Sequence, residues 1–208
     1  MIRIVTIDRE YGSGAGDIAR KLAERLGWKL WDQELTDEIA RLLDCPGKTV
    51  EEHQERNDPV TYRLFKSFMR GSFEGSLNTP RLKMVDADCI REIAERVVTD
   101  IAKSGNGVIV GRGSFYYLHD CTVALHVFIY APFDEKVRRL VSKGKTQSKA
   151  VELVETVDQE RAEYIRKYFN AEWPSRQFFH LMINSAMGED LAVETVAHAV
   201  SEFDKQPV

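Results

Sequence analysis

The start of the chain constrains its fold most strongly: an apolar run leads into a glycine-rich turn, and the turn leads into an amphipathic segment. Residues 2–7 are nearly all apolar, which is typical of a strand buried on both faces. Residues 12–16 read Gly-Ser-Gly-Ala-Gly. Asp17 then opens a segment whose apolar residues recur at helical spacing. We therefore expect a buried strand, a tight turn and a helix, in that order.

The same alternation of strands and helices continues along the chain. Four more apolar stretches predict strands, the clearest of them at residues 123–130. Strands joined by helical crossovers pair in parallel, with helices on both faces of the sheet. The predicted fold class is therefore α/β, a three-layer α/β/α arrangement with a five-stranded parallel sheet, in which ligands bind at the carboxyl ends of the strands. The predicted strands are residues 2–7, 28–31, 108–110, 123–130 and 181–183.

A central segment, residues 34–104, departs from this alternation. It is mainly helical, with a helix expected at about 86–103 and a loop at 71–80 that is rich in Gly, Ser, Asn and Pro. A chain of 208 residues suits a single domain with such an insertion. We expect residues 1–33 and 105–208 to form its core. The apolar face of the middle helices is compatible with a homodimer.

Charge and cysteine content exclude several classes of protein. The chain has 33 acidic and 29 basic residues, a formal net charge of -4, which argues against a general nucleic-acid binder or a polybasic membrane binder. No apolar run is long enough to span a bilayer, and the start of the sequence does not resemble a secretory signal. Cys45, Cys89 and Cys121 give neither a disulfide framework nor a metal-binding pair. We therefore predict a cytoplasmic protein that binds neither nucleic acid nor membrane.

The glycine turn has the context of a phosphate-binding P-loop but lacks part of its motif. Glycines let backbone N–H groups approach a phosphate closely, and the helix N-terminus adds partial positive charge. When the second glycine of the pattern G-x-x-x-x-G-K-[ST] is aligned with Gly14, the first falls on Arg9 and the lysine on Ala15. The lysine that normally contacts the transferred phosphate is therefore missing. We favour phosphate binding; the alternative is a tight turn without a ligand.

Five segments of the chain resemble the cytidylate kinase-like family, a branch of the P-loop nucleoside monophosphate kinases. Residues 7–14 are similar to the opening signature of that branch, which also lacks the P-loop lysine. Residues 108–113 are similar to its third strand and the following Gly-Arg pair. The order and spacing of the segments carry the resemblance. The other three are residues 26–35 (second strand), 158–169 (helix after the lid) and 179–185 (last strand).

The resemblance implies a P-loop kinase fold and phosphoryl transfer from ATP, with Mg²⁺, to a nucleoside monophosphate, CMP or dCMP first. It also implies that residues 34–104 bind the acceptor and that the segment at about 143–149 is a lid. The glycine loop would then hold the phosphates of ATP. The residues expected to bind ATP are Gly12, Ser13, Gly14, Ala15, Gly16 and Asp17.

Because Ala15 carries no charge, other cations must stabilise the transferred phosphoryl group. Arg9, at the end of the first strand, is the first candidate; the alternative is a solvated arginine that pairs with Glu10. Six basic residues flank the predicted lid, and we expect at most about half of them to reach phosphate. These six are Arg138, Arg139, Lys143, Lys145, Arg161 and Arg166. The predicted catalytic residues are Arg9, Arg138, Arg161 and Arg166.

Four further residues are candidates for binding the metal or the acceptor. Asp17 is expected to hold Mg²⁺, directly or through water, although a carboxylate is favourable at a helix N-terminus in any case. Arg112 follows a buried strand, where it either contacts a substrate phosphate or forms a salt bridge that closes the end of the sheet. Asp32 either reads the acceptor nucleoside or caps the next helix. Asp8 is a second possible metal ligand or base, or simply ends the strand.

Two other functions stay open. A kinase of the same fold could phosphorylate another nucleotide or small metabolite, because residues 34–104 depart most from familiar patterns. A nucleotide-binding regulator without turnover is the second alternative, and Ala15 and Asp17 motivate it. A catalyst should need Arg9 and magnesium for turnover, whereas a sensor should bind nucleotide and form no product.

Overall fold

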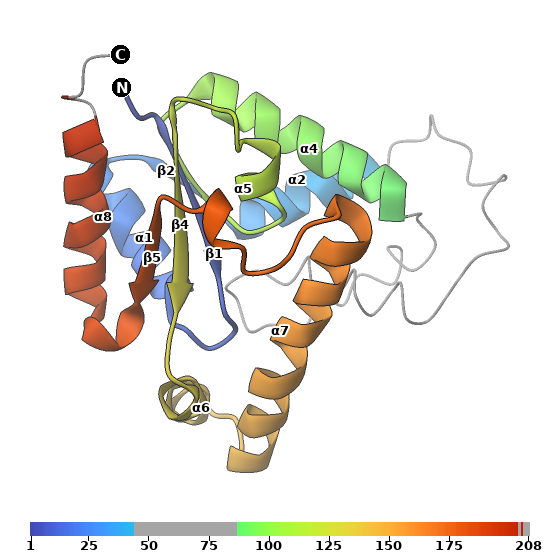
Figure 1. Ribbon diagram of the computed structural model, residues 1–208, viewed down its shortest axis with the longest axis vertical. Coiled ribbons are helices and arrows are strands. Elements are labelled where there is room, and N and C mark those ends of the chain that lie inside the picture. The colour runs from blue at the N-terminus through green and yellow to red at the C-terminus, as the bar shows by residue number, and fades with distance from the viewer. Residues whose placement is uncertain (44–86, 204, 206–208) are drawn as a thin grey trace, which may run out of the picture.

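The computed structural model describes residues 1–43, 87–203 and 205, and within them the chain forms a parallel sheet of five strands (Figure 1). The strand order is β2-β3-β1-β4-β5, which confirms the predicted sheet. Strand β1, which precedes the glycine turn, is central: its Ile4 pairs with Gly107 on one side and Ala124 on the other. The strands are β1 (Ile4–Arg9), β2 (Lys29–Trp31), β3 (Gly107–Val110), β4 (Ala124–Tyr130) and β5 (Leu181–Asn184).

Helices cover both faces of the sheet and complete the predicted three layers. The helices α1 (Ala15–Leu26) and α8 (Glu189–Phe203) lie on one face. The opposite face is covered by α2 (Gln33–Leu43), α4 (Ala87–Ser104), α5 (Ser114–Tyr117) and the C-terminal part of α7 (Gln147–Phe169). Helix α6 (Phe133–Ser142) lies beyond the carboxyl end of β4 (Figure 1). Two short 3₁₀ helices, η3 (Arg176–Phe178) and η4 (Ser185–Met187), flank β5.

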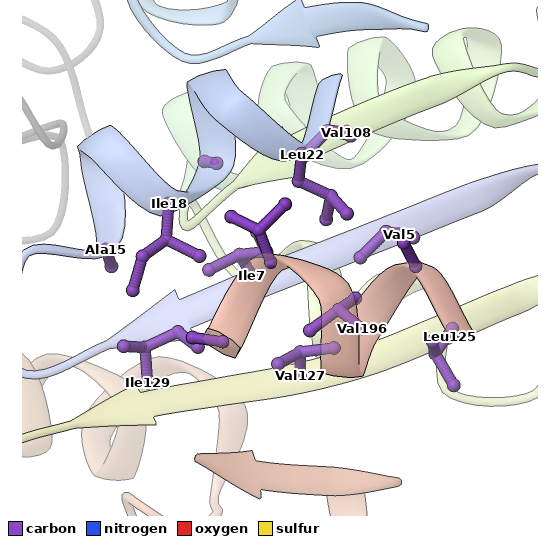
Figure 2. Close-up of a cluster of buried hydrophobic side chains, with 14 of the residues drawn as sticks. Val5, Ile7, Ala15, Ile18, Leu22, Val108, Leu125, Val127, Ile129 and Val196 are labelled. Carbon is purple, nitrogen blue, oxygen red and sulfur yellow. The ribbon is translucent and has the colours of Figure 1, made fainter. Parts of the chain in front are cut away.

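The core consists of one apolar cluster on each face of the sheet. Val5 and Ile7 of β1 point towards α1 and α8, and they pack there with Ile18 and Val196 (Figure 2). Ile4 of the same strand belongs to the cluster on the other face. This alternation buries both faces of β1, as the apolar run at residues 2–7 predicts.

Helix boundaries near the glycine turn and the lid differ slightly from the prediction. Helix α1 begins at Ala15, two residues earlier than predicted, with Gly14 as its N-cap. Helix α7 begins at Gln147, because Thr146 caps it by accepting a hydrogen bond from the Lys149 amide. The predicted lid at 143–149 is therefore a turn at residues 143–146 followed by the start of α7.

The predicted loop at 71–80 and most of the predicted insertion lie outside the described residues. The helix expected at 86–103 is present as α4. Within the described ranges, no helix has the length and apolar character needed to cross a bilayer.

His126 on β4 is a buried histidine that the fold keeps neutral. Its Nδ1 lies 2.7 Å from the Thr6 hydroxyl and its Nε2 lies 3.0 Å from the Leu118 carbonyl oxygen. Its ring stacks on that of His180, with centroids 5.1 Å apart. Burial, with a smaller contribution from His180, lowers the pKa of His126 from 6.5 to about 4. Between these two values the unfolded chain binds the proton more readily than the folded one, so stability falls as the pH falls.

We therefore expect the protein to lose about 2 kcal/mol of unfolding free energy between pH 7 and pH 5 through His126 alone. The measurement is urea denaturation at both pH values for the wild type and for His126→Gln. The variant should lose correspondingly less between the two pH values, whatever its stability at pH 7. His198→Gln, at an exposed histidine, is the matched control. Equal losses in all three proteins would assign the acid sensitivity to other groups.

Candidate active site

A cavity of about 150 Å³ lies at the carboxyl end of β1, against the glycine loop. This is the edge of a parallel sheet at which ligands bind. All six predicted ATP-binding residues, 12–17, line it. Four cationic side chains and three acidic ones share the lining: Arg9, Arg139, Lys143 and Arg161, and Glu10, Asp17 and Glu189.

The glycine loop presents the N-terminus of α1 to this cavity. Gly14 has a φ of 78°, and a Cβ there would lie 3.1 Å from Nη1 of Arg139, so the position favours glycine on both grounds. Gly14 is the N-cap of α1 and has no side chain with which to cap it, and the first N–H groups of a helix have no partner within it. The loop therefore offers backbone donors and a partial positive charge to an anion.

Two side chains distant in sequence hold the loop in place. The Ser13 carbonyl oxygen accepts hydrogen bonds from Nη1 of Arg139 at 2.5 Å and from Oγ of Ser185 at 2.6 Å. Arg139 also donates to Oγ and the carbonyl oxygen of Ser185, at 2.8 and 3.0 Å. Ser185, in η4, was not predicted as a site residue. Its contact needs the folded sheet, so local sequence gave no signal for it.

Arg9 is buried, in contrast to the solvated arginine that was the alternative. Its Nη1 lies 3.4 Å from Oδ1 of Asp8, whose other oxygen accepts a hydrogen bond from Nε1 of Trp173. A Cβ on Gly111 would lie 2.0 Å from Nη1 of Arg9, so only a glycine leaves room for this guanidinium. Glu10 pairs instead with Lys136, at 3.0 Å. Arg9 is thus a fixed positive charge in the cavity wall.

Arg161 is also buried, and it connects α7 to the end of β1. Its Nη1 donates to the Arg9 carbonyl oxygen at 2.6 Å and to Oδ1 of Asp158 at 2.9 Å. Asp158 also accepts a hydrogen bond from the Tyr11 amide at 2.8 Å. Burial raises the pKa of Asp158, against the lowering effects of Arg161 and Tyr11. The carboxylate therefore fixes both Arg161 and the start of the loop.

The six basic residues around the predicted lid fall into two groups. Arg139, Lys143 and Arg161 line the cavity, while Arg138, Lys145 and Arg166 are outside its lining. Arg138 is 72% exposed and pairs with Glu135 at 2.7 Å, and Arg166 is exposed on α7. Of the predicted catalytic residues, the structure thus brings Arg9 and Arg161 together at the cavity and leaves Arg138 and Arg166 outside it.

Asp17 lies in the first turn of α1, where its Oδ2 is 3.3 Å from Nζ of Lys143. Within the described residues, no cluster of three potential metal-binding side chains occurs. Mg²⁺ in phosphate sites commonly uses only one or two carboxylates, together with phosphate oxygens and water. A single half-exposed carboxylate beside a phosphate-sized cavity fits that donor set.

The predicted acceptor residues Arg112 and Asp32 are paired with each other. Nη1 of Arg112 donates to Oδ1 of Asp32 at 2.7 Å and to the Val110 carbonyl oxygen at 2.8 Å, and Nη2 donates to the Thr36 hydroxyl. Arg112 is buried in the left-handed region, with a φ of 54°. Burial lowers the pKa of its guanidinium, and Asp32 opposes that effect. The pair joins the end of β3 to the start of α2.

Comparison with known proteins agrees with the family resemblance found in the sequence. The sequence profile of the cytidylate kinase-like family matches residues 4–187. An uncharacterised protein from Eubacterium ventriosum is 21% identical, with a TM-score of 0.67 and coverage of 97% of this chain and 99% of that one. A search of curated proteins gave no match.

Two shikimate kinases are also similar in structure. The enzyme from Bacteroides thetaiotaomicron is 15% identical, with a TM-score of 0.53 and coverage of 97% of this chain and 99% of that one. The enzyme from Acinetobacter baumannii, solved in complex with shikimate, is 18% identical, with a TM-score of 0.51 and coverage of 97% and 95%. At these identities the likeness shows the fold alone, and it confirms the predicted P-loop kinase fold.

Proposed function

The chain belongs to the cytidylate kinase-like family, and from this premise we propose that it transfers the terminal phosphoryl group of ATP to a nucleoside monophosphate, CMP or dCMP first. The observation that carries the proposal is the cavity at the glycine loop, where four cationic side chains share the lining with the N-terminus of a helix. A phosphate chain is the ligand that such an arrangement stabilises. The homodimer and the cytoplasmic location stay predictions.

In the proposed reaction an oxygen of the acceptor phosphate attacks the terminal phosphorus of ATP, and the bond from that phosphorus to the bridging oxygen of ADP breaks. The products are ADP and a nucleoside diphosphate. Such reactions need positioning and positive charge more than covalent participation by the protein. Arg9 and Arg161 would supply that charge from fixed, buried positions, and the loop amides would hold the phosphates. Arg112 and Asp32 would act on the acceptor side by fixing the end of β3.

Among the described carboxylates that line the cavity, Asp17 is best placed to hold Mg²⁺. Glu10 and Glu189 pair with lysines at 3.0 and 2.9 Å, whereas the ion pairs of Asp17 are longer, at 3.3 Å to Lys143 and 3.9 Å to Arg20. The Asp17 carboxylate is 40% exposed, and Asp17 lines the cavity. Bound magnesium would neutralise part of the phosphate charge.

The test is ADP formation from ATP with a panel of acceptors, with and without Mg²⁺. We expect turnover with CMP or dCMP, and none after chelation of the metal. Shikimate and other nucleotides belong in the panel, because the acceptor can differ between kinases of one fold. Turnover of a different acceptor would contradict CMP and dCMP as acceptors but support the proposed phosphoryl transfer. ATP binding without any product would contradict the kinase proposal and favour a nucleotide-binding regulator.

A further inference from the structure

The glycine loop has a charge deficit relative to a standard P-loop. A lysine is replaced by Ala15, and Asp17 adds a negative charge within the same turn of helix. Phosphates bound here would meet one cation fewer and one anion more. Since phosphoryl transfer depends on positive charge at the terminal phosphate, that deficit needs compensation close to the loop.

Three of the four cations in the cavity are fixed by the protein. Arg9 and Arg161 are buried, with the contacts described above. Arg139 is held by Ser13, Ser185 and Glu135, the last at 2.9 Å from its Nε. The positive charges of these guanidinium groups therefore stay in the same positions. None of them can follow a phosphate without breaking the contacts described above.

Lys143 differs from these three in exposure and in its position. It follows the last residue of α6, and its amide bonds to the Arg139 carbonyl oxygen, so the backbone places it beside the loop. Its side chain is 46% exposed, and its ammonium group pairs with the 40% exposed carboxylate of Asp17 at 3.3 Å. An exposed ion pair of this kind is weak, so a stronger anion can replace the carboxylate. A lysine stem is flexible enough to follow the new partner.

We propose that Lys143 is the cation that replaces the missing P-loop lysine, and that Asp17 holds it at the mouth of the cavity until nucleotide binds. The ammonium group then passes from the Asp17 carboxylate to the terminal phosphate of ATP, and Asp17 becomes available to the metal. The two half-exposed side chains thus form one exchangeable pair. This inference rests on the proposed function, because it requires ATP to occupy the glycine loop.

The proposal is tested by calorimetric binding of ATP and of ADP, with Mg²⁺, to the full chain. Lys143→Ala should weaken ATP binding about 10-fold or more, the loss of a charge-assisted hydrogen bond, and should weaken ADP binding by less than about 3-fold. Lys143→Arg should keep most of the preference for ATP. Lys149→Ala is the matched control, because Lys149 is 50% exposed and pairs with Glu152 outside the cavity. Its affinities for both nucleotides should stay within about 2-fold of the wild type.

Asp17→Asn supplies a second readout that does not depend on turnover. Without metal it should bind ATP more tightly than the wild type, because repulsion disappears and Lys143 is released. Adding Lys143→Ala should remove the part of that gain that comes from Lys143, which a double-mutant cycle measures. Equal losses of ATP and ADP affinity in Lys143→Ala, or no loss, would overturn the assignment of Lys143 alone. If the wild type binds no ATP, the proposed function fails and this inference fails with it.

Discussion

Replacing Arg9 with methionine is expected to lower kcat of phosphoryl transfer by about 1000-fold, the scale found when a positioned donor or arginine is removed from a transition state. Arg9 lies in the cavity wall, buried beside Asp8 and against Gly111. A guanidinium in such a place needs little reorganisation when charge develops on the phosphoryl group. The loss should therefore appear mainly in kcat, with a smaller change in the affinity for ATP.

The experiment compares steady-state kinetics of the wild type with those of Arg9→Met and Arg9→Lys. Arg25→Met is the control, because Arg25 is exposed at the other end of α1 and pairs with Glu194. Thermal unfolding of each variant separates lost chemistry from lost folding. Where Arg9→Met is too unstable to assay, Arg9→Lys keeps the charge and should retain part of the activity. If folded Arg9→Met turns over within a few-fold of the wild type, Arg9 has no role in the transfer.

Replacing Arg112 with methionine is expected to lower the free energy of unfolding by about 3–5 kcal/mol. The substitution leaves the carboxylate of Asp32 buried without the guanidinium that lies 2.7 Å from it. The Thr36 hydroxyl and the Val110 carbonyl oxygen lose a donor at the same time. The backbone cost of the left-handed conformation is the same for both side chains, so it does not contribute to the difference.

A double variant makes this prediction sharper. In Asp32→Leu with Arg112→Met, both charges are gone, and most of the stability should return, because an apolar pair often replaces a buried ion pair without loss. Urea denaturation of the single and double variants gives the coupling directly. Arg138→Met, at an exposed arginine, should change stability by less than about 0.5 kcal/mol. A double variant no more stable than the single one would mean that the pair matters through its shape rather than its charge.

The strands and the layering could be predicted from the sequence because each rests on a local pattern. Buried parallel strands need continuous apolar runs, and all five predicted runs overlap the observed strands. Helix α1 begins two residues before the predicted start, because Gly14 caps it with a left-handed backbone that composition does not reveal. Helix α7 begins inside the predicted lid, because the Thr146 side chain caps it. The helix expected at 86–103 is present as α4, which ends one residue later than predicted.

The site could be predicted only in part, since its contacts join distant segments. Arg9 could be predicted because it ends β1, and the loop because it follows that strand. Arg112 and Asp32 could be predicted because they follow β3 and β2. The side chains that hold these groups are different: Ser185 meets Ser13 only when β5 lies beside β4, and Asp158 meets Tyr11 only when α7 crosses the end of the sheet. Their residue types gave no chemical signal of their own.

The hydrogen bond from Ser185 to the Ser13 carbonyl oxygen also affects when the glycine loop can take its final shape during synthesis. Because 172 residues separate Ser13 from Ser185, the glycine loop leaves the ribosome well before the serine that shapes it. Strand β1 likewise cannot pair until both neighbouring strands, which begin at Gly107 and Ala124, have been synthesised. A nascent chain therefore carries the whole loop sequence before the cavity beside the loop can form. The cavity at the glycine loop can therefore be complete only when the sheet has formed as far as β5.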